Sequence, residues 1–203
     1  MNDEADWRRP RLVENAVELL ERQLTRKRDR IDVVHLCLTT DPFMVGHPEV
    51  TSLSLALIER LNGHGVRASV LTKGVLPAEL ADARYDRGNT VGISLVSLDE
   101  GFRRRFEPGA ALYRERIAGL ERLHAAGCRT LVHIEPYPTP NIVRQEVGPL
   151  LEAVAFVDEL YFGGWNYSRL AGASAERDGF YRSQGRVVRA FCQQHHIRAT
   201  IEC

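Results

Sequence analysis

The chain has 203 residues, and 44% of them are hydrophobic, so it is long enough to bury a substantial core. Lysine plus arginine and aspartate plus glutamate number 27 each, and this balance gives no electric field that would favour nonspecific binding to nucleic acid. The sequence has neither the run of about 20 apolar residues that a membrane span requires nor the apolar core of a signal peptide, so we expect a cytoplasmic protein.

Helical and strand-like patterns alternate along the whole chain. Strands that are each reached through a helix form a parallel sheet with right-handed crossovers. The sequence therefore predicts an α/β fold, with a parallel (β/α) sheet of about six strands that is either open or curved into a partial TIM-type barrel. Apolar residues at helical spacing predict helices over 11–29, 48–61, 77–85, 99–107, 112–126, 142–155 and 174–195. Short apolar runs predict strands over 33–38, 67–73, 90–97, 129–135, 157–162 and 197–201.

This pattern begins with a helix rather than with a strand. We therefore expect that the first βα half-unit of the barrel is missing and that residues 1–203 form a single, N-terminally incomplete domain. Without a preceding strand, the strand over 33–38 would expose unpaired backbone groups, and open strand edges recruit other strands. We expect the chain to self-associate through this edge.

Polar side chains cluster where the predicted strands end. The carboxyl ends of parallel strands meet at one edge of the sheet, and ligands bind there in this class of fold. Lys73 is unusual at such a position because the only other lysine of this arginine-rich chain is Lys27. A lysine, hydroxyls and carboxylates at one rim suit a small zwitterionic ligand, while the same residue types also favour Asx turns and helix caps. The residues expected at this rim are Thr39, Thr40, Asp41, Thr72, Lys73, Ser94, Ser97, Glu135, Asn141, Trp165, Asn166 and Tyr167.

Several motifs with well-defined chemistry are absent from the sequence. The four cysteines have none of the close spacings of zinc, redox or iron–sulfur sites, so we expect buried free thiols and no metal site. No histidine pair has the HExxH spacing, and each histidine is expected to be structural or at the surface. The dinucleotide-binding motif GxGxxG and the P-loop motif are absent too, which excludes these two phosphate cradles.

The rim residues and their order resemble those of a known family. Thr40-Asp41-Pro42-Phe43 with Glu49 is similar to the family's Thr-Asp-Pro-Tyr and glutamate, and Leu71-Thr72-Lys73-Gly74 is similar to its Thr-Lys-Ser. Phe106-Glu107-Pro108-Gly109-Ala110 with Arg116 resembles its Glu-Pro-x-Ala-Pro segment and arginine. In these motifs the chain resembles radical S-adenosylmethionine (SAM) proteins of the spore photoproduct lyase branch.

This resemblance implies a partial (β/α)6 barrel that binds SAM at the carboxyl ends of its strands. In the family a [4Fe–4S] cluster reduces SAM to a 5′-deoxyadenosyl radical, which abstracts hydrogen, and lyases are among the members. The positions that the resemblance implies as SAM contacts are Thr40, Asp41, Lys73, Ser94, Ser97, Glu107, Arg116 and Asn141.

The CxxxCxxC loop that holds the cluster in this family has no counterpart here. Motif order places it just upstream of Arg9, where the sequence has only MNDEADW, and Cys37 lies within a predicted strand. We therefore expect the isolated chain to be inactive, with the cluster supplied by a CxxxCxxC-bearing partner polypeptide or by an upstream segment. The alternative is a degenerate module that binds SAM, another nucleoside or a protein partner without redox chemistry. Gly74 also replaces the family's serine, which removes one hydroxyl donor.

Overall fold

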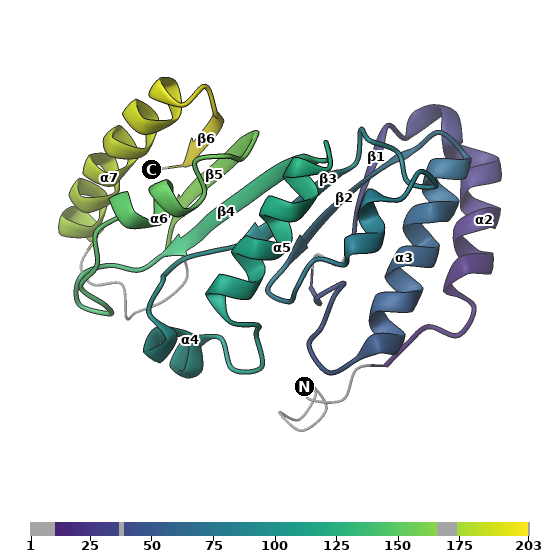
Figure 1. The fold of residues 1–203 in the computed structure, drawn as a ribbon, viewed down its shortest axis with the longest axis horizontal. Helices are drawn as coiled ribbons and strands as arrows, with labels where there is room; N and C mark the ends of the chain where they lie inside the picture. Colours follow the sequence, from purple (N-terminus) through teal and green to yellow (C-terminus); the bar gives the residue numbers. More distant parts are fainter. Residues whose placement is uncertain (1–10, 37–38, 166–173, 203) are drawn as a thin grey trace.

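A computed structural model describes residues 11–36, 39–165 and 174–202, whose strands form one all-parallel sheet (Figure 1). Neighbours in the sheet are also neighbours in the chain, so the strand order is β1-β2-β3-β4-β5-β6. The predicted alternation of helices and parallel strands is thus confirmed. The strands are β1 (Val33–Leu36), β2 (Arg67–Thr72), β3 (Thr90–Ser94), β4 (Arg129–Tyr137), β5 (Glu159–Gly164) and β6 (Arg198–Glu202).

The helices follow the predicted pattern, with marked differences in length over 77–85, where only a 3-10 helix of four residues forms, and over 142–155. Within 142–155 only α6 forms, because the amides of Ile142 and Val143 both donate to the carbonyl of Thr139 and close a turn there. Helix α5 is followed by Gly127 with φ at +81°, a left-handed conformation that glycine adopts without strain. The helices are α2 (Ala16–Lys27), α3 (Pro48–Gly63), α4 (Glu100–Phe106), α5 (Tyr113–Ala125), α6 (Gly148–Ala153) and α7 (Ser174–Gln194), with 3-10 helices η1 (Arg28–Arg30) and η2 (Ala78–Ala81).

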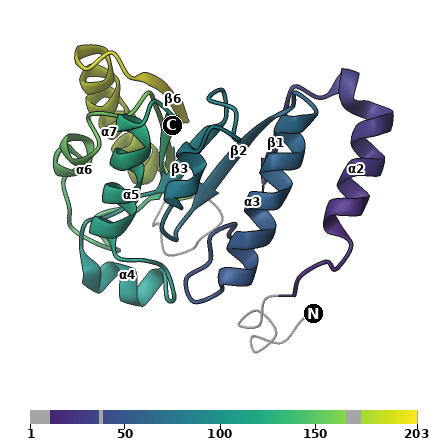
Figure 2. The ribbon, with the colours of Figure 1, turned by 45° about the vertical axis from the view of Figure 1, so that its right-hand side comes forward.

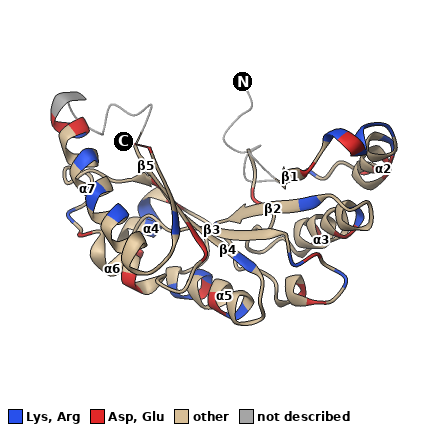
Figure 3. Cartoon of the chain, turned by 90° about the horizontal axis from the view of Figure 1, so that it is seen from above, with Lys and Arg blue, Asp and Glu red and all other residues tan. Residues whose placement is uncertain are grey.

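Helices cover one face of the curved sheet, and the opposite face is open (Figure 3). Alternate residues of each strand point to these two faces. On the covered face, the core includes Val70, Ile93, Val132 and Phe162, each of which is 1% exposed or less. The sheet is therefore part of a barrel wall, with its apolar residues against the helices and its other face available to ligands.

Side chains on the open face line up in rows across the strands. The rows exist because the register of each strand continues into the next one. Two of them form the middle of the open face. The first runs through Leu71, Gly92, Leu131, Glu159 and Arg198, and the second, nearer the carboxyl ends, through Ser94, His133, Tyr161 and Thr200.

Strands β1 and β6 are the two edges of the described sheet. β1 is four residues long, pairs with β2 and leaves Val33 52% exposed. Helix α2 lies beside α3 (Figure 2), where His64 Nε2 is 2.8 Å from Oε2 of Glu21 and Arg28 donates to the carbonyl of His64. Self-association through β1 stays a prediction. In the described ranges, no helix combines the length and the apolar character that crossing a membrane requires.

Candidate functional site

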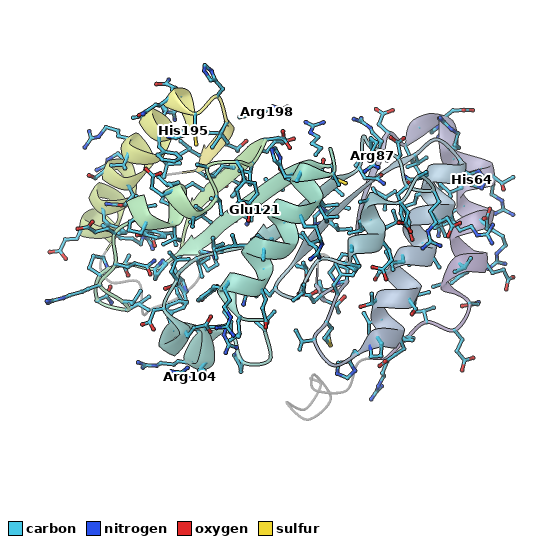
Figure 4. The ribbon with its side chains drawn as sticks, viewed as in Figure 1. His64, Arg87, Arg104, Glu121, His195 and Arg198 are labelled. Carbon is cyan, nitrogen blue, oxygen red and sulfur yellow. The ribbon has the colours of Figure 1, made fainter. Side chains whose placement is uncertain are left out.

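A cavity of about 760 Å³ occupies the open face of the sheet. Every strand of the described sheet contributes to its lining, together with the loop that follows β1. Arg198, which Figure 4 labels, borders it at the start of β6. Most of the lining residues are polar, which is unusual for the interior of a barrel and indicates a binding surface. The polar lining residues are His35, Thr39, Thr40, Asp41, Ser69, Thr72, Lys73, Ser94, His133, Glu135, Glu159, Tyr161, Arg198 and Thr200.

The carboxylate of Asp41 ties the loop after β1 to the end of β2. Its Oδ1 accepts hydrogen bonds from the amide of Phe43 (2.9 Å) and the hydroxyl of Thr72 (2.5 Å). Its Oδ2 accepts one from the amide of Lys73 (2.7 Å). Hydrogen bonds to a charged acceptor are stronger than neutral ones, so Asp41 fixes the position of Lys73.

Gly74 lets the same loop and strand approach each other closely. A Cβ added to Gly74 would lie 1.9 Å from the carbonyl oxygen of Phe43, which no side chain tolerates unless the backbone moves. The Gly74 amide donates to Oγ1 of Thr72 (2.7 Å), which in turn donates to Asp41. The glycine that stands in place of the family's serine therefore has a steric role here.

Lys73 is held at the edge of the cavity with its ammonium group accessible. Its carbonyl accepts a hydrogen bond from the amide of Ala111 (2.9 Å), so the backbone of Lys73 is fixed on both sides. Its Nζ lies 4.0 Å from Oε1 of Glu107, and the side chains are 41% and 5% exposed respectively. A second hollow of about 650 Å³ begins at Asp41 and Lys73 and extends between Met44 and Pro108. An accessible ammonium in a fixed position suits a carboxylate ligand.

Arg116 lies fully buried behind this rim. Its Nε donates to the carbonyl of Ala111 (3.0 Å), its Nη1 to the carbonyl of Ser94 (2.9 Å) and its Nη2 to Oε2 of Glu107 (2.8 Å). Its guanidinium also stacks near the ring of Tyr113, 4.8 Å from the ring centre. Arg116 has no exposed surface, so it does not reach the cavity. Its hydrogen bonds hold Glu107 and the end of β3 in place behind the rim.

The structure brings most of the other predicted SAM contacts together. The larger cavity is lined by Thr40, Asp41, Lys73 and Ser94, and the smaller one by Glu107. These residues come from loops and strand ends far apart in the sequence, so the expected convergence at one rim is observed.

Ser97 and Asn141 lie away from both cavities. The hydroxyl of Ser97 donates to Oε1 of Gln145 (2.7 Å) and accepts from the amide of Asp99, so it joins the loops after β3 and β4. Asn141 is exposed and accepts a hydrogen bond from the hydroxyl of Thr139 (2.6 Å). Of the residues expected after β5, Asn166 and Tyr167 lie outside the described residues.

Two stacked rings in the cavity were not singled out by any motif. The rings of His133 and Tyr161 are parallel within 4°, and their centres lie 4.2 Å apart. The available signal was the alternation of polar and apolar residues in β4, since a parallel strand covered on both faces is apolar throughout. Arg129, His133 and Glu135 share the open face of this strand.

The imidazole of His133 is neutral at pH 7. Burial, followed by the positive charge of Lys73, lowers the pKa of His133 to about 4. Its approach to Glu135, with Nε2 3.8 Å from Oε2, is therefore a contact with an uncharged ring. Burial and the neighbouring carboxylate of Glu202 raise the pKa of Glu135. This side of the cavity thus offers a neutral ring next to a carboxyl group.

The described residues do not fit an iron–sulfur cluster. Such a cluster needs several thiolates at one place. Cys128 is buried, where its Sγ lies 3.3 Å from Nη1 of Arg87 and 3.7 Å from the carbonyl of Leu80, and Cys192 is buried in α7, where burial raises the pKa of its thiol. Among the residues that the structure describes, no three His, Cys, Asp or Glu side chains form a group that could hold a metal ion.

Comparison with known proteins shows the family. A model described as the radical SAM superfamily matches residues 2–154, and the chain belongs to that superfamily. An uncharacterised protein, ORF301 of Acidianus two-tailed virus, is 26% identical over 148 residues, which are 72% of this chain and 47% of the viral protein. The chain thus spans about half the length of this curated relative.

Solved structures share the fold at low sequence identity. Spore photoproduct lyase, in a structure with bound AdoMet and a dinucleoside spore photoproduct, is 16% identical with a TM-score of 0.64, over 90% of this chain and 64% of the lyase. SuiB of Streptococcus suis, bound to its precursor peptide SuiA, is 16% identical with a TM-score of 0.64, over 97% of this chain and 44% of SuiB. The partial barrel expected from the sequence is therefore the fold of this chain.

We predict that Gly74→Ala lowers the free energy of unfolding by about 1–3 kcal/mol, because the added Cβ collides with the carbonyl of Phe43. Gly63→Ala is the matched control, since nothing lies within 4 Å of a Cβ at this position in α3. Alanine there should be neutral or stabilising by up to about 1 kcal/mol. Urea denaturation of both variants measures the difference, and equal midpoints would contradict the steric role of Gly74.

We predict that His133 titrates with a midpoint near 4 in the folded protein, because burial and Lys73 disfavour its charged form. The unfolded chain then binds more protons than the folded chain between pH 4 and the ordinary value of about 6.5. The contribution of His133 to the free energy of unfolding therefore falls as the pH drops through this window. NMR titration of the ring protons tests the value, and a midpoint near that of the unfolded chain would refute it.

Proposed function

We propose that the chain binds SAM in the cavity on its open face, with the ammonium of Lys73 contacting the carboxylate of the ligand. The observation that carries this proposal is the position of Lys73, whose backbone is fixed by Asp41 and Ala111 while its ammonium borders the cavity. Membership of the radical SAM superfamily supports the choice of ligand, and the spore photoproduct lyase structure contains AdoMet.

The other rim residues have distinct roles in this proposal. Thr40 offers a hydroxyl group in the cavity, which suits the ribose or the amino group of the ligand. Glu107 orients the ammonium of Lys73, and Arg116 holds Glu107 from behind. When bound, SAM supplies the 5′-deoxyadenosyl group that radical SAM chemistry uses. The chain itself supplies the position and orientation of that ligand.

We also propose that the [4Fe–4S] cluster comes from outside these 203 residues, on a partner polypeptide or an upstream segment with a CxxxCxxC loop. The sequence has no such motif, and the described thiols are buried away from the cavity. Hydrogen abstraction or lyase activity would then belong to the assembled protein, and the isolated chain would bind SAM without turnover.

A second candidate function is binding of SAM or a related nucleoside without redox chemistry. It is favoured by the cavity together with a lack of cluster ligands among the described residues. The two functions share the ligand site and differ in whether a cluster is ever added, so they are separable by experiment.

We predict that Lys73→Ala weakens SAM binding by about 1–3 kcal/mol, because a charge-assisted hydrogen bond to the carboxylate is lost. Lys27→Ala is the matched control, since it removes the only other lysine, at the exposed end of α2. Isothermal titration calorimetry of the three proteins measures the affinities. Equal affinity in a folded Lys73→Ala protein, or no SAM binding by the unmodified chain, would refute the proposal.

We predict that anaerobic reconstitution with iron and sulfide gives no brown iron–sulfur chromophore with the isolated chain. Adding the upstream coding segment or a neighbouring CxxxCxxC protein should produce the chromophore and allow reductive SAM cleavage. The matched control is the same added segment with its cysteines replaced by alanine. If the complete CxxxCxxC segment loads a cluster but SAM cleavage does not depend on this chain, the redox proposal fails and the second candidate function remains.

A further inference from the structure

A gap lies on the open face between Lys73 and His133. Ser94 pairs in register with His133 on β4, and Lys73 directly follows Thr72, which pairs with Ile93 on β3. Adjacent strands are about 4.8 Å apart, so Lys73 and His133 are separated by two strand spacings, roughly 10 Å. Only the small side chain of Ser94 stands between them in this row, and all three residues line the cavity.

The stacked rings of His133 and Tyr161 form one side of this gap. His133 and Tyr161 are registered neighbours on β4 and β5, and their rings lie face to face. One face of the His133 imidazole is therefore covered by Tyr161, and the other is turned toward β3. The residue of β3 in that row is Ser94, which is too short to cover a ring. A planar ring above Ser94 would continue the stack as its third member.

The floor of the gap is rigid and apolar. A Cβ added to Gly92 would lie 3.2 Å from Cβ of Leu131 and 3.3 Å from Cδ1 of Leu71, so the two leucines close over the glycine. The carbonyl of Ser94 is held by Arg116 (2.9 Å), and the amide of Leu95 donates to the carbonyl of His133 (3.0 Å). Strands β3 and β4, which carry Ser94 and His133, are thus hydrogen-bonded to each other before any ligand enters.

The side chains around the gap determine which kind of ring can bind there. His133 is neutral at pH 7 and presents an uncharged aromatic face. The carboxyl group of Glu135 lies over Gly163 of β5, where a Cβ would be 2.7 Å from Oε1 of Glu135, and so it is on the Tyr161 side of His133. The uncharged face of His133 favours stacking of a planar aromatic ring.

We propose that the gap above Ser94 is a binding slot for one planar heteroaromatic ring of the substrate, which stacks on His133. The proposal deepens the proposed function and rests on it in one respect, the assignment of the ring to the substrate rather than to the adenine of SAM. Binding of a ring in the slot does not itself require SAM.

The test is an NMR titration of the whole chain with adenine and with indole, both in the absence of SAM. The expected result is a saturable upfield ring-current shift of the His133 or Tyr161 ring protons, with no such shift from cyclohexanol, which is not planar. His133→Leu and Ser94→Leu, which remove the stacking face and fill the slot, should each lower the ring affinity at least about fivefold. His133→Phe keeps a flat face and should stay within about twofold of the unmodified chain.

Three results would overturn the proposal. The first is a lack of saturable shifts in the unmodified chain, and the second is equal ring affinity in a folded His133→Leu protein and in the His133→Phe protein. The third is competition, because loss of ring binding in the presence of saturating S-adenosylhomocysteine would assign the slot to the adenine of SAM. Ring binding by a chain that fails to bind SAM in calorimetry would retain the slot while the proposed function fails.

Discussion

The buried guanidinium of Arg116 is the interaction on which the shape of the site depends. A buried charge is strongly destabilising unless it is paired and hydrogen-bonded, so the three groups around it cannot move independently. These groups are the carbonyls of Ser94 and Ala111 and the carboxylate of Glu107. They hold the end of β3 against the loop between α4 and α5. Through Glu107 and the amide of Ala111, the same loop sets the position of Lys73.

The second constraint is the one-sided covering of the sheet. Where helices cover the strands, the side chains are apolar and form the core. A closed barrel would also fill its interior with apolar side chains. In this chain the open face instead carries a lysine, hydroxyls, carboxyl groups and a neutral imidazole. The residues that pack the core and those that line the cavity therefore alternate along the same strands.

Much of the fold and part of the site followed from the sequence, because strand and helix periodicity are local. The positions of Lys73, Asp41 and Ser94 were predictable, since parallel strands present their carboxyl ends together. The burial of Arg116 was not, because it depends on contacts between β3 and the loop before α5 that no short motif encodes. The stacking of His133 likewise depends on the register between β4 and β5, which packing sets.

The central claim is that a preformed rim around Lys73 binds SAM. Backbone amide chemical shifts, followed by NMR as SAM is added to the chain, test it most directly because every part of the fold is observed at once. We expect the largest changes at Lys73, Gly74 and Ser94, with little change in α2 or at Cys128, neither of which lines the cavity. Changes confined to α2 and α3, with none at the rim, would contradict it.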